Sequence, residues 1–184
     1  MLKDEIKEYI PYNEQEEKDK EIILHCLEQK NVFCRTNKIA HITSSAWVVN
    51  KERTKVLMAY HKIYDSWAWL GGHNDGNKNC LEVAIKEVKE ESGLKEVQPV
   101  LDSIYSLEVL TVDGHVKKGE YVSSHLHLNI TYLLEADENQ PLTVKEDENK
   151  DVTWFDLEQA IQKSSEPWFQ EHVYAKLNEK LKTI

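Results

Sequence analysis

Two stretches of the chain alternate strictly between two sets of side chains, which is the period of a β-strand. In residues 40–49 the even-numbered positions form one face: Ile42, Ser44, Ala46 and Val48. The odd-numbered positions form the other face: His41, Thr43, Ser45, Trp47 and Val49. In residues 124–135 one face is polar: His125, His127, Asn129 and Thr131. Both stretches are therefore predicted to be strands of a sheet.

Other segments complete this sheet. Residues 55–61 follow the polar turn 51–53 and are rich in apolar side chains, so they are predicted to form a hairpin with residues 40–49. Residues 101–112 are predicted to form one long strand, and residues 152–155 a last short one.

The remaining segments of the second half are expected to be loops and helices. Residues 116–121 are polar and residues 136–151 are acidic and turn-rich, so both are predicted to be exposed loops. Asp156 is expected to cap a helix over residues 157–162. Pro167 is expected to begin the last helix.

Residues 1–38 are predicted to form a helical appendage. After a short apolar edge, Pro11 breaks the pattern, and a helix is predicted from Asn13 to Lys30, with Asn13 and Glu16 as its capping box. Its expected buried stripe consists of Ile22, Ile23, Cys26 and Leu27. The appendage could pack on the domain or provide a homodimer contact, and the sequence does not distinguish the two.

The clearest helix follows Gly71-Gly72 in the stretch GGHNDGNKNCLEVAIKEVKEESGL. Asn79 can cap its start and Gly93 can end it in a left-handed conformation. Apolar residues recur at helical spacing and form one stripe: Leu81, Ala84, Ile85 and Val88. Another face carries Glu87, Glu90 and Glu91, whose charges repel one another. A divalent cation would turn this repulsion into shared coordination.

The run from Gly72 to Leu94 resembles the Nudix box, in the GGHxDG form found in one bacterial branch of the family. The residues in register are Gly72, Glu87, Val88, Glu90, Glu91, Gly93 and Leu94. Lys78 stands where the pattern has Glu, and Lys86 where it has Arg. The wider likeness extends over roughly residues 39–162.

The resemblance implies an α/β (α+β) fold, a Nudix-type α/β/α sandwich with a mixed central sheet. The domain would span residues 39–184 with its C-terminal helices, and residues 1–38 would be the appendage. It also implies that Glu87, Glu90 and Glu91, beside Gly72, hold Mg²⁺ or Mn²⁺. Glu90, Glu87 and Lys86 would then be the catalytic residues.

The same resemblance implies a substrate site around the glycine turn, and its candidate residues are Trp69, Gly71, Gly72, His73, His125 and His127. Trp69 could stack on a base or belong to the core. His125 and His127 point to one side of their strand and could bind metal, contact phosphate or line a polar sheet face. The general base is left open between Glu90, Glu120 and Glu148.

Composition narrows the class of partner. The 184 residues carry 23 Lys and Arg against 33 Asp and Glu, a formal charge of -10. This excludes a general nucleic-acid surface but not a small nucleotide, whose phosphates a metal ion can neutralise. The sequence has no long apolar run for a membrane span and no signal-peptide core. The three cysteines show no paired spacing, which favours the cytoplasm.

These features lead to two main hypotheses. The first is a Mg²⁺-dependent hydrolase that cleaves the diphosphate bond in a nucleoside diphosphate linked to another moiety, X. The second is a Nudix-like module that senses a nucleotide or sugar nucleotide without cleaving it, which the lysines at positions 78 and 86 would permit. An isopentenyl-diphosphate isomerase of the same fold would need a catalytic cysteine, and Cys80 is expected to be a packing residue instead.

Overall fold

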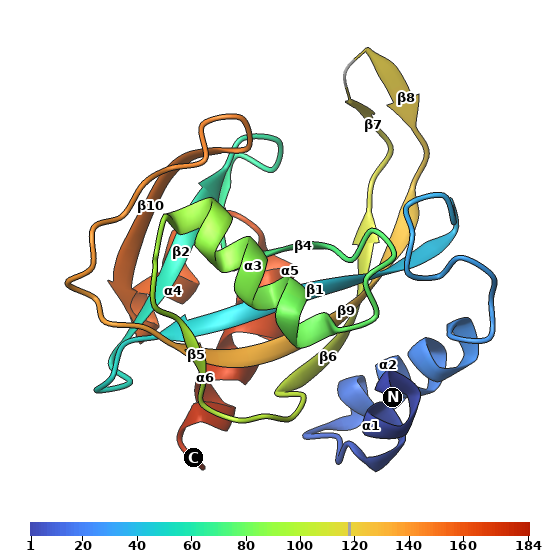
Figure 1. Ribbon diagram of the computed structural model, residues 1–184, viewed down its shortest axis with the longest axis horizontal. Helices are drawn as coiled ribbons and strands as arrows, with labels where there is room; N and C mark the ends of the chain where they lie inside the picture. Colours follow the sequence, from blue (N-terminus) through green and yellow to red (C-terminus); the bar gives the residue numbers. More distant parts are fainter. Residues whose placement is uncertain (118) are drawn as a thin grey trace.

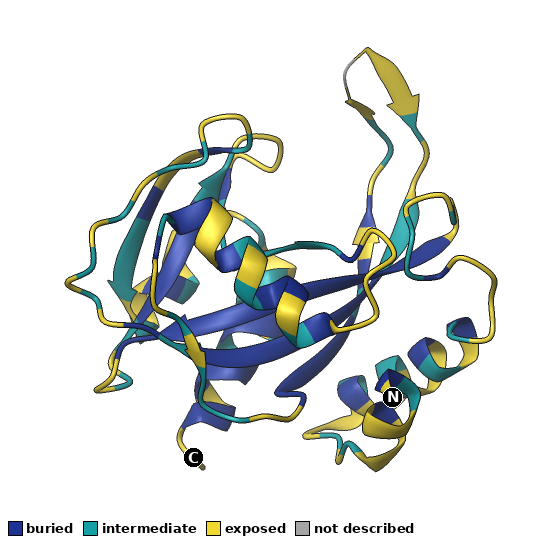
Figure 2. Ribbon diagram, viewed as in Figure 1, coloured by how far each residue is buried: buried dark blue, intermediate teal, exposed yellow. Residues whose placement is uncertain are grey.

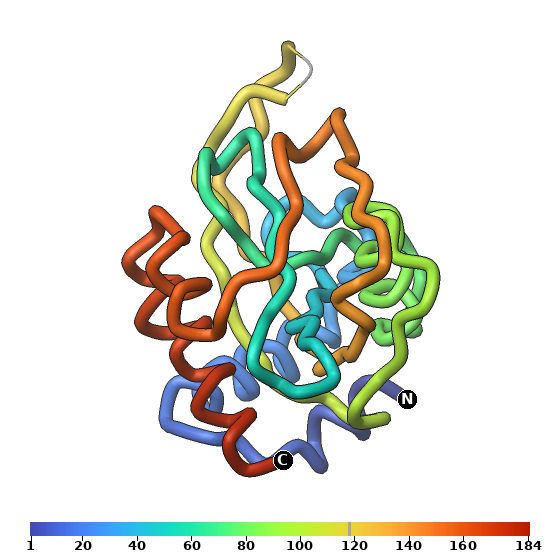
Figure 3. The backbone as a smooth tube through the Cα atoms, turned by 90° about the vertical axis from the view of Figure 1, so that its left-hand side faces the viewer, coloured from blue at the N-terminus to red at the C-terminus, as the bar shows by residue number. Residues whose placement is uncertain are grey.

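The computed structural model describes residues 1–117 and 119–184 of the chain. A mixed eight-stranded sheet separates helix α3 (Cys80–Ser92) on one face from the C-terminal helices on the other, as Figure 1 and Figure 3 show. The predicted α/β/α sandwich with a mixed central sheet is therefore confirmed.

The sheet is built around a parallel pair of long strands, β1 (Ala40–Val49) and β9 (His125–Glu135). The other strands of the sheet are β2 Lys55–His61, β3 Ser66–Ala68, β4 Leu70–His73, β5 Gln98–Pro99, β6 Ser106–Val112 and β10 Asn149–Asp156. The order in the sheet is β10-β2-β1-β9-β5, and in addition β3 pairs with β2, β4 with β1 and β6 with β9. A separate hairpin pairs β7 (His115–Lys117) with β8 (Glu120–Val122).

Two hydrophobic clusters hold the helices on the sheet. The even-numbered residues of β1 pack with α3 and the N-terminal segment, and the odd-numbered Trp47 and Val49 pack with the C-terminal helices. The helices besides α3 are α1 Leu2–Glu8, α2 Glu14–Cys26, α4 Leu157–Lys163, α5 Pro167–Phe169, the π-helical η1 Gln170–Tyr174 and α6 Ala175–Leu181. Both faces of β1 are therefore buried (Figure 2).

The strands agree with the sequence prediction in kind and differ at several ends. β1 and β2 are antiparallel as predicted, although their register contains only the pair Val49 and Val56. The strand expected over 101–112 begins at Ser106. The loop predicted for 116–121 is wrong where β7 and β8 pair, because an exposed hairpin needs no apolar face to satisfy its backbone hydrogen bonds. Lys118 lies outside the described residues.

The helices also differ in detail. Asn13 caps α2 through the amide of Glu16 as predicted, but the helix ends at Cys26 instead of Lys30. Ile22, predicted to be buried, is 45% exposed, because α2 turns Glu16 and Ile23 toward the domain. Asp156 precedes α4 but makes no capping hydrogen bond with its side chain.

The N-terminal segment is attached through a buried group of charges. Glu16 Oε1 lies 2.9 Å from Lys180 Nζ and 3.2 Å from Lys176 Nζ, both on α6. Ser106 of β6 donates to the same carboxylate at 2.7 Å, and Lys176 also pairs with Glu108 at 3.0 Å. Residues far apart in sequence thus hold α2, the sheet and α6 together.

Among the described residues, no helix has both the length and the apolar character needed to cross a membrane.

Candidate active site at the glycine turn

Helix α3 begins and ends where the sequence predicted. The side chain of Asn79 accepts from the amide of Glu82, and Gly93 ends the helix with φ 75°, which favours glycine. Ala84 and Val88 are fully buried against the sheet. This packing leaves the glutamate side of α3 facing strand β4 and the solvent beside it.

Two of the three glutamates contact the glycine turn. The amide of Gly71 donates to Glu91 Oε2 at 3.1 Å. A Cβ atom at Gly72 would lie 2.6 Å from Glu87 Cδ, so the absence of a side chain there makes room for the carboxylate. Gly71, Gly72, Glu87 and Glu91 therefore form one compact group.

The third glutamate is held by lysines. Glu90 Oε1 lies 3.0 Å from Lys86 Nζ, and Glu90 Oε2 lies 4.0 Å from Lys145 Nζ. Lys86 Nζ also lies 3.5 Å from Glu87 Oε1. Lys86 therefore bridges two of the glutamates, although an ammonium group lacks the planar fork of a guanidinium.

Burial and mutual repulsion make the carboxylates reluctant to ionise. Burial raises the pKa of Glu91 to about 8, and Glu87 and Glu148 add to this effect against the hydrogen bond from Gly71. Burial also raises the pKa of Glu87, despite the nearby Lys86 and Lys145. A group of this kind gains from any cation that replaces its protons.

Lys145 also belongs to this group, although no pattern in the sequence indicated it. It lies in the segment between β9 and β10, and its Nζ is 2.9 Å from Glu148 Oε2. Burial alone would lower the pKa of Lys145, but the charges of Glu148, Glu87 and Glu91 outweigh burial and raise it. A lysine in an acidic, turn-rich stretch has no periodicity that could indicate its partners, so only the fold brings it here.

The candidate bases are separated by the fold. Glu148 lies close enough to Glu91 to raise the pKa of Glu91, whereas Glu120 is exposed on β8 in the projecting hairpin (Figure 1).

Lys78 precedes α3, and Glu87 follows about two helical turns after the start of that helix. Cys80 is buried and accepts a hydrogen bond from Asn74 Nδ2 at 3.3 Å, in keeping with a packing role.

Trp69 lies between β3 and β4 and is half-buried. Its ring meets Tyr174 edge-on at 5.9 Å and Phe169 at 6.3 Å between ring centroids. Trp69 is therefore packed against the C-terminal helices, and the residue as a whole remains partly accessible.

His73, His125 and His127 lie on the sheet face opposite α3. His73 pairs with Thr43 of β1, and His127 pairs with His41, so alternation along the strands places all of these side chains on one face. His41 completes this group, but the sequence indicated it only as a strand residue. The histidines and the glutamates thus occupy different faces of the sheet.

The arrangement on α3 suits a hard divalent cation. It supplies carboxylate oxygens, a backbone turn without side chains at Gly71 and Gly72, and lysines that balance part of the negative charge. Oxygen ligands of this kind favour Mg²⁺ or Mn²⁺ over softer metals.

Comparisons with known proteins agree with this geometry. The NUDIX domain model matches residues 40–177. A Nudix hydrolase from Clostridium perfringens shares 22% identity over 78% of this chain and 97% of its own, with a TM-score of 0.54. RenU, a Nudix hydrolase from M. smegmatis, shares 15% identity over 78% of this chain and 87% of its own, with a TM-score of 0.57. A C. elegans Ap4A hydrolase shares 17% identity over 77% of this chain and 95% of its own, with a TM-score of 0.51.

At these identities the solved structures establish the fold, and the domain match establishes the family. No curated protein matches the chain. The matched region contains the glycine turn, helix α3 and the segment that carries Lys145. The chain therefore belongs to the Nudix family, whose enzymes hydrolyse phosphorus-containing anhydrides.

Proposed function

We propose that the protein is a Mg²⁺-dependent hydrolase that cleaves the diphosphate bond of a nucleoside diphosphate linked to another moiety, X, and that Mn²⁺ can replace Mg²⁺. The observation that carries this proposal is the contact of two glutamates, Glu91 buried and Glu87 half-buried, with a glycine turn. Glu91 accepts from the Gly71 amide at 3.1 Å, and Glu87 fills the space that Gly72 leaves open. A binding module that never cleaves its ligand has no need to withdraw two carboxylates from solvent in this way.

In this proposal Glu87, Glu90 and Glu91 hold the metal beside Gly72. A bound Mg²⁺ would polarise the phosphoryl oxygens and ease deprotonation of the attacking water. Glu90 is the most exposed of the three side chains, at 43%, and can accept the proton of that water. To accept this proton, the carboxylate of Glu90 has to give up its ion pairs with Lys86 and Lys145 and form a hydrogen bond to the water.

The two lysines would have different tasks. Lys86 contacts both Glu87 and Glu90, so we assign it the positioning of these carboxylates. Lys145 is only 25% exposed and lies within reach of Glu90 and Glu148. Its fixed charge would favour the negative phosphates of the substrate. Glu148 remains an alternative base, because it is the acid beside Lys145.

The substrate would extend from the glycine turn. Gly71 and Gly72 allow close approach of a phosphate to the backbone. The accessible part of Trp69 would stack on a base, and His73, His125 and His127 would contact moiety X from the other face of the sheet. C. elegans Ap4A hydrolase and the E. coli dihydroneopterin triphosphate pyrophosphohydrolase share the fold, so dinucleoside polyphosphates and pterin triphosphates belong among the substrates to test.

The alternative is a module that binds a nucleotide or sugar nucleotide without cleaving it. Lys86 and Lys145 favour this reading, because they already neutralise Glu90. Both hypotheses expect ligand binding, and only the hydrolase expects turnover that depends on Mg²⁺.

A substrate panel tests the proposal. The purified protein is incubated with nucleoside triphosphates, dinucleoside polyphosphates, ADP-ribose, sugar nucleotides and dihydroneopterin triphosphate, and the products are separated by ion-exchange chromatography. We expect cleavage of at least one compound with Mg²⁺ or Mn²⁺ and none with a chelator. The matched control is Glu87→Gln. A rise in Tm with a ligand but no product from any compound would support the sensor and contradict the hydrolase.

A further inference from the structure

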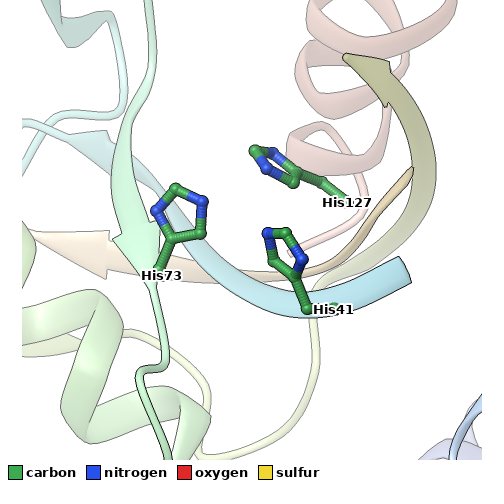
Figure 4. A group of neighbouring side chains, drawn as sticks. All are labelled: His41, His73 and His127. Carbon is green, nitrogen blue, oxygen red and sulfur yellow. The ribbon is translucent and has the colours of Figure 1, made fainter. Parts of the chain in front are cut away.

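Three histidines meet on the sheet face opposite α3. His41 of β1, His73 of β4 and His127 of β9 come from three adjacent strands, and Figure 4 shows their rings turned toward one shared space. The ring centroids are separated by 5.1 Å for His41 and His73, 5.0 Å for His41 and His127, and 4.9 Å for His73 and His127. One ligand atom from each ring lies within 4.8 Å of the others.

The hydrogen bonds leave ring nitrogens free inside this group. His41 Nδ1 lies 3.0 Å from the carbonyl oxygen of Asn37, so Nδ1 carries the proton and Nε2 keeps its lone pair. His41 is 4% exposed, and its Nε2 is buried without a hydrogen-bond partner among the described residues. His127 Nε2 is buried in the same way. Metal-binding histidines commonly anchor one nitrogen on a carbonyl and ligate through the other.

A purely structural role accounts poorly for these nitrogens. Histidines gathered for packing would be expected to hydrogen-bond to one another or to a neighbouring polar group. Within residues 1–117 and 119–184, no hydrogen bond joins the three rings. Burying a polar ring nitrogen without a partner is unfavourable, so two of them in one place call for a ligand.

The charge of the rings also suits a metal. Burial lowers the pKa of His73 to about 3 and that of His127 to about 2, and their neighbours oppose a second positive charge. Arg35, Asp75 and Lys117 are the charged groups that act on His73, and Arg35 and Asp75 are bound to each other at 2.7 Å. Burial thus disfavours the charged form of these rings, and the neutral imidazole is the form that ligates metals.

We propose that His41, His73 and His127 bind one transition-metal ion of the zinc class, at a site separate from the carboxylates of α3. Imidazole nitrogen is a preferred ligand of Zn²⁺ and a poor one for Mg²⁺. Three histidines leave a fourth position for water or an anionic oxygen. The ligand atoms of a tetrahedral zinc lie about 3.3 Å apart, so ion binding would draw the rings inward by rotation of their side chains.

His125 lies beside this site but is not one of the three histidines whose ligand atoms come within 4.8 Å of one another. Its ring stacks on that of His41 at 4.9 Å, and its Nδ1 lies 2.9 Å from the carbonyl oxygen of Ser123. This arrangement again leaves Nε2 available. The proposed metal site goes beyond the proposed hydrolase function, which uses His73 and His127 to contact moiety X, and metal binding does not require hydrolysis.

Cobalt titration tests the site. Protein without a histidine tag is stripped with a chelator and titrated with Co²⁺, whose visible absorption is strong only in tetrahedral sites. We expect saturation at one ion per chain, displacement by Zn²⁺ and no displacement by millimolar Mg²⁺. The variants His73→Gln and His127→Gln should each bind at least about tenfold more weakly. The partly exposed His172 lies on η1 outside this group, so His172→Gln is the matched control and should bind like the wild type.

A second measurement separates binding from folding. Zn²⁺ should raise the Tm of the wild type and of Glu90→Gln equally, and this rise should be absent in His73→Gln and His127→Gln. Circular dichroism checks that the variants fold, and the spectrum of wild-type protein with Co²⁺ needs no variant at all. A wild type that gives no tetrahedral spectrum, or binding that both histidine variants retain, would overturn the proposal. Loss of hydrolase activity alone would leave these outcomes unchanged.

Discussion

A Cβ atom on Gly72 would lie 2.6 Å from Glu87 Cδ and 2.8 Å from its Oε2, so the carboxylate of Glu87 rests directly on the backbone of the glycine turn. The neighbouring glycine is different. A Cβ atom on Gly71 would meet the carbonyl oxygen of Ser44 and Cα of Ser45, each at 2.6 Å. One glycine therefore makes room for a flexible side chain, and the other for the backbone of β1.

We predict that Gly72→Ala and Gly71→Ala fail in different ways. The methyl group at position 72 pushes the Glu87 carboxylate aside, so kcat/KM should fall about 100-fold while the free energy of unfolding changes by less than about 1 kcal/mol. The methyl group at position 71 strains the pairing of β4 with β1 and should cost about 1–3 kcal/mol. Urea unfolding and steady-state kinetics measure the two effects. An inactive Gly72→Ala that is also the less stable variant would contradict this assignment.

Glu90→Gln should lower turnover at least about 100-fold and leave the fold intact, because the amide can neither accept a proton nor ligate a metal as a carboxylate does. Single-turnover kinetics on the substrate found in the panel measure the effect. Circular dichroism and Tm serve as the controls. Turnover similar to that of the wild type would remove Glu90 from the catalytic group.

Lys86→Arg should leave activity equal or raise it. The lysine already contacts Glu90 at 3.0 Å and Glu87 at 3.5 Å, and a guanidinium can hold two carboxylates at once through its planar donors. The comparison of kcat and KM for Lys86→Arg and Lys86→Met separates positioning from charge. A large loss in Lys86→Arg would mean that the lysine contacts the substrate itself.

The stability of the protein should depend on Glu16 at acid pH. Burial alone would raise the pKa of its carboxyl, but Lys176 and Lys180 outweigh burial and lower it from 4.5 to about 2. The ion pairs therefore stabilise the fold fully above pH 4.5, and the stabilisation is lost as the pH falls toward 2. Glu16→Gln should destabilise the protein at pH 7 by about 3–5 kcal/mol, and the difference from wild type should shrink over that acid range.

Urea unfolding at a series of pH values measures this dependence, and the exposed Glu17→Gln is the matched control. A difference between Glu16→Gln and wild type that stays constant from pH 7 to pH 2.5 would show that the carboxylate charge is not what holds the N-terminal segment in place.

Local patterns in the sequence were sufficient for the long strands β1 and β9, for helix α3 and for its glutamate face, but not for the β7–β8 hairpin or the end of α2. Asn79 and Gly93 act on the amides and φ angles of their own helix, so the bounds of α3 could be predicted without knowledge of the fold. The alternation along β1 and β9 likewise predicted which side chains share a face. The burial of both faces of β1 could not be predicted, because it depends on which helices cover the sheet.

The tertiary structure alone decided which distant residues meet. His41, His73 and His127 lie on three strands whose registers bring them to one level of the sheet, and no spacing within a strand encodes that register. Lys145 reaches Glu90 only because the segment after β9 returns beside α3. Periodicity fixes the direction of a side chain relative to its own element, whereas contacts between elements follow from how the whole core packs.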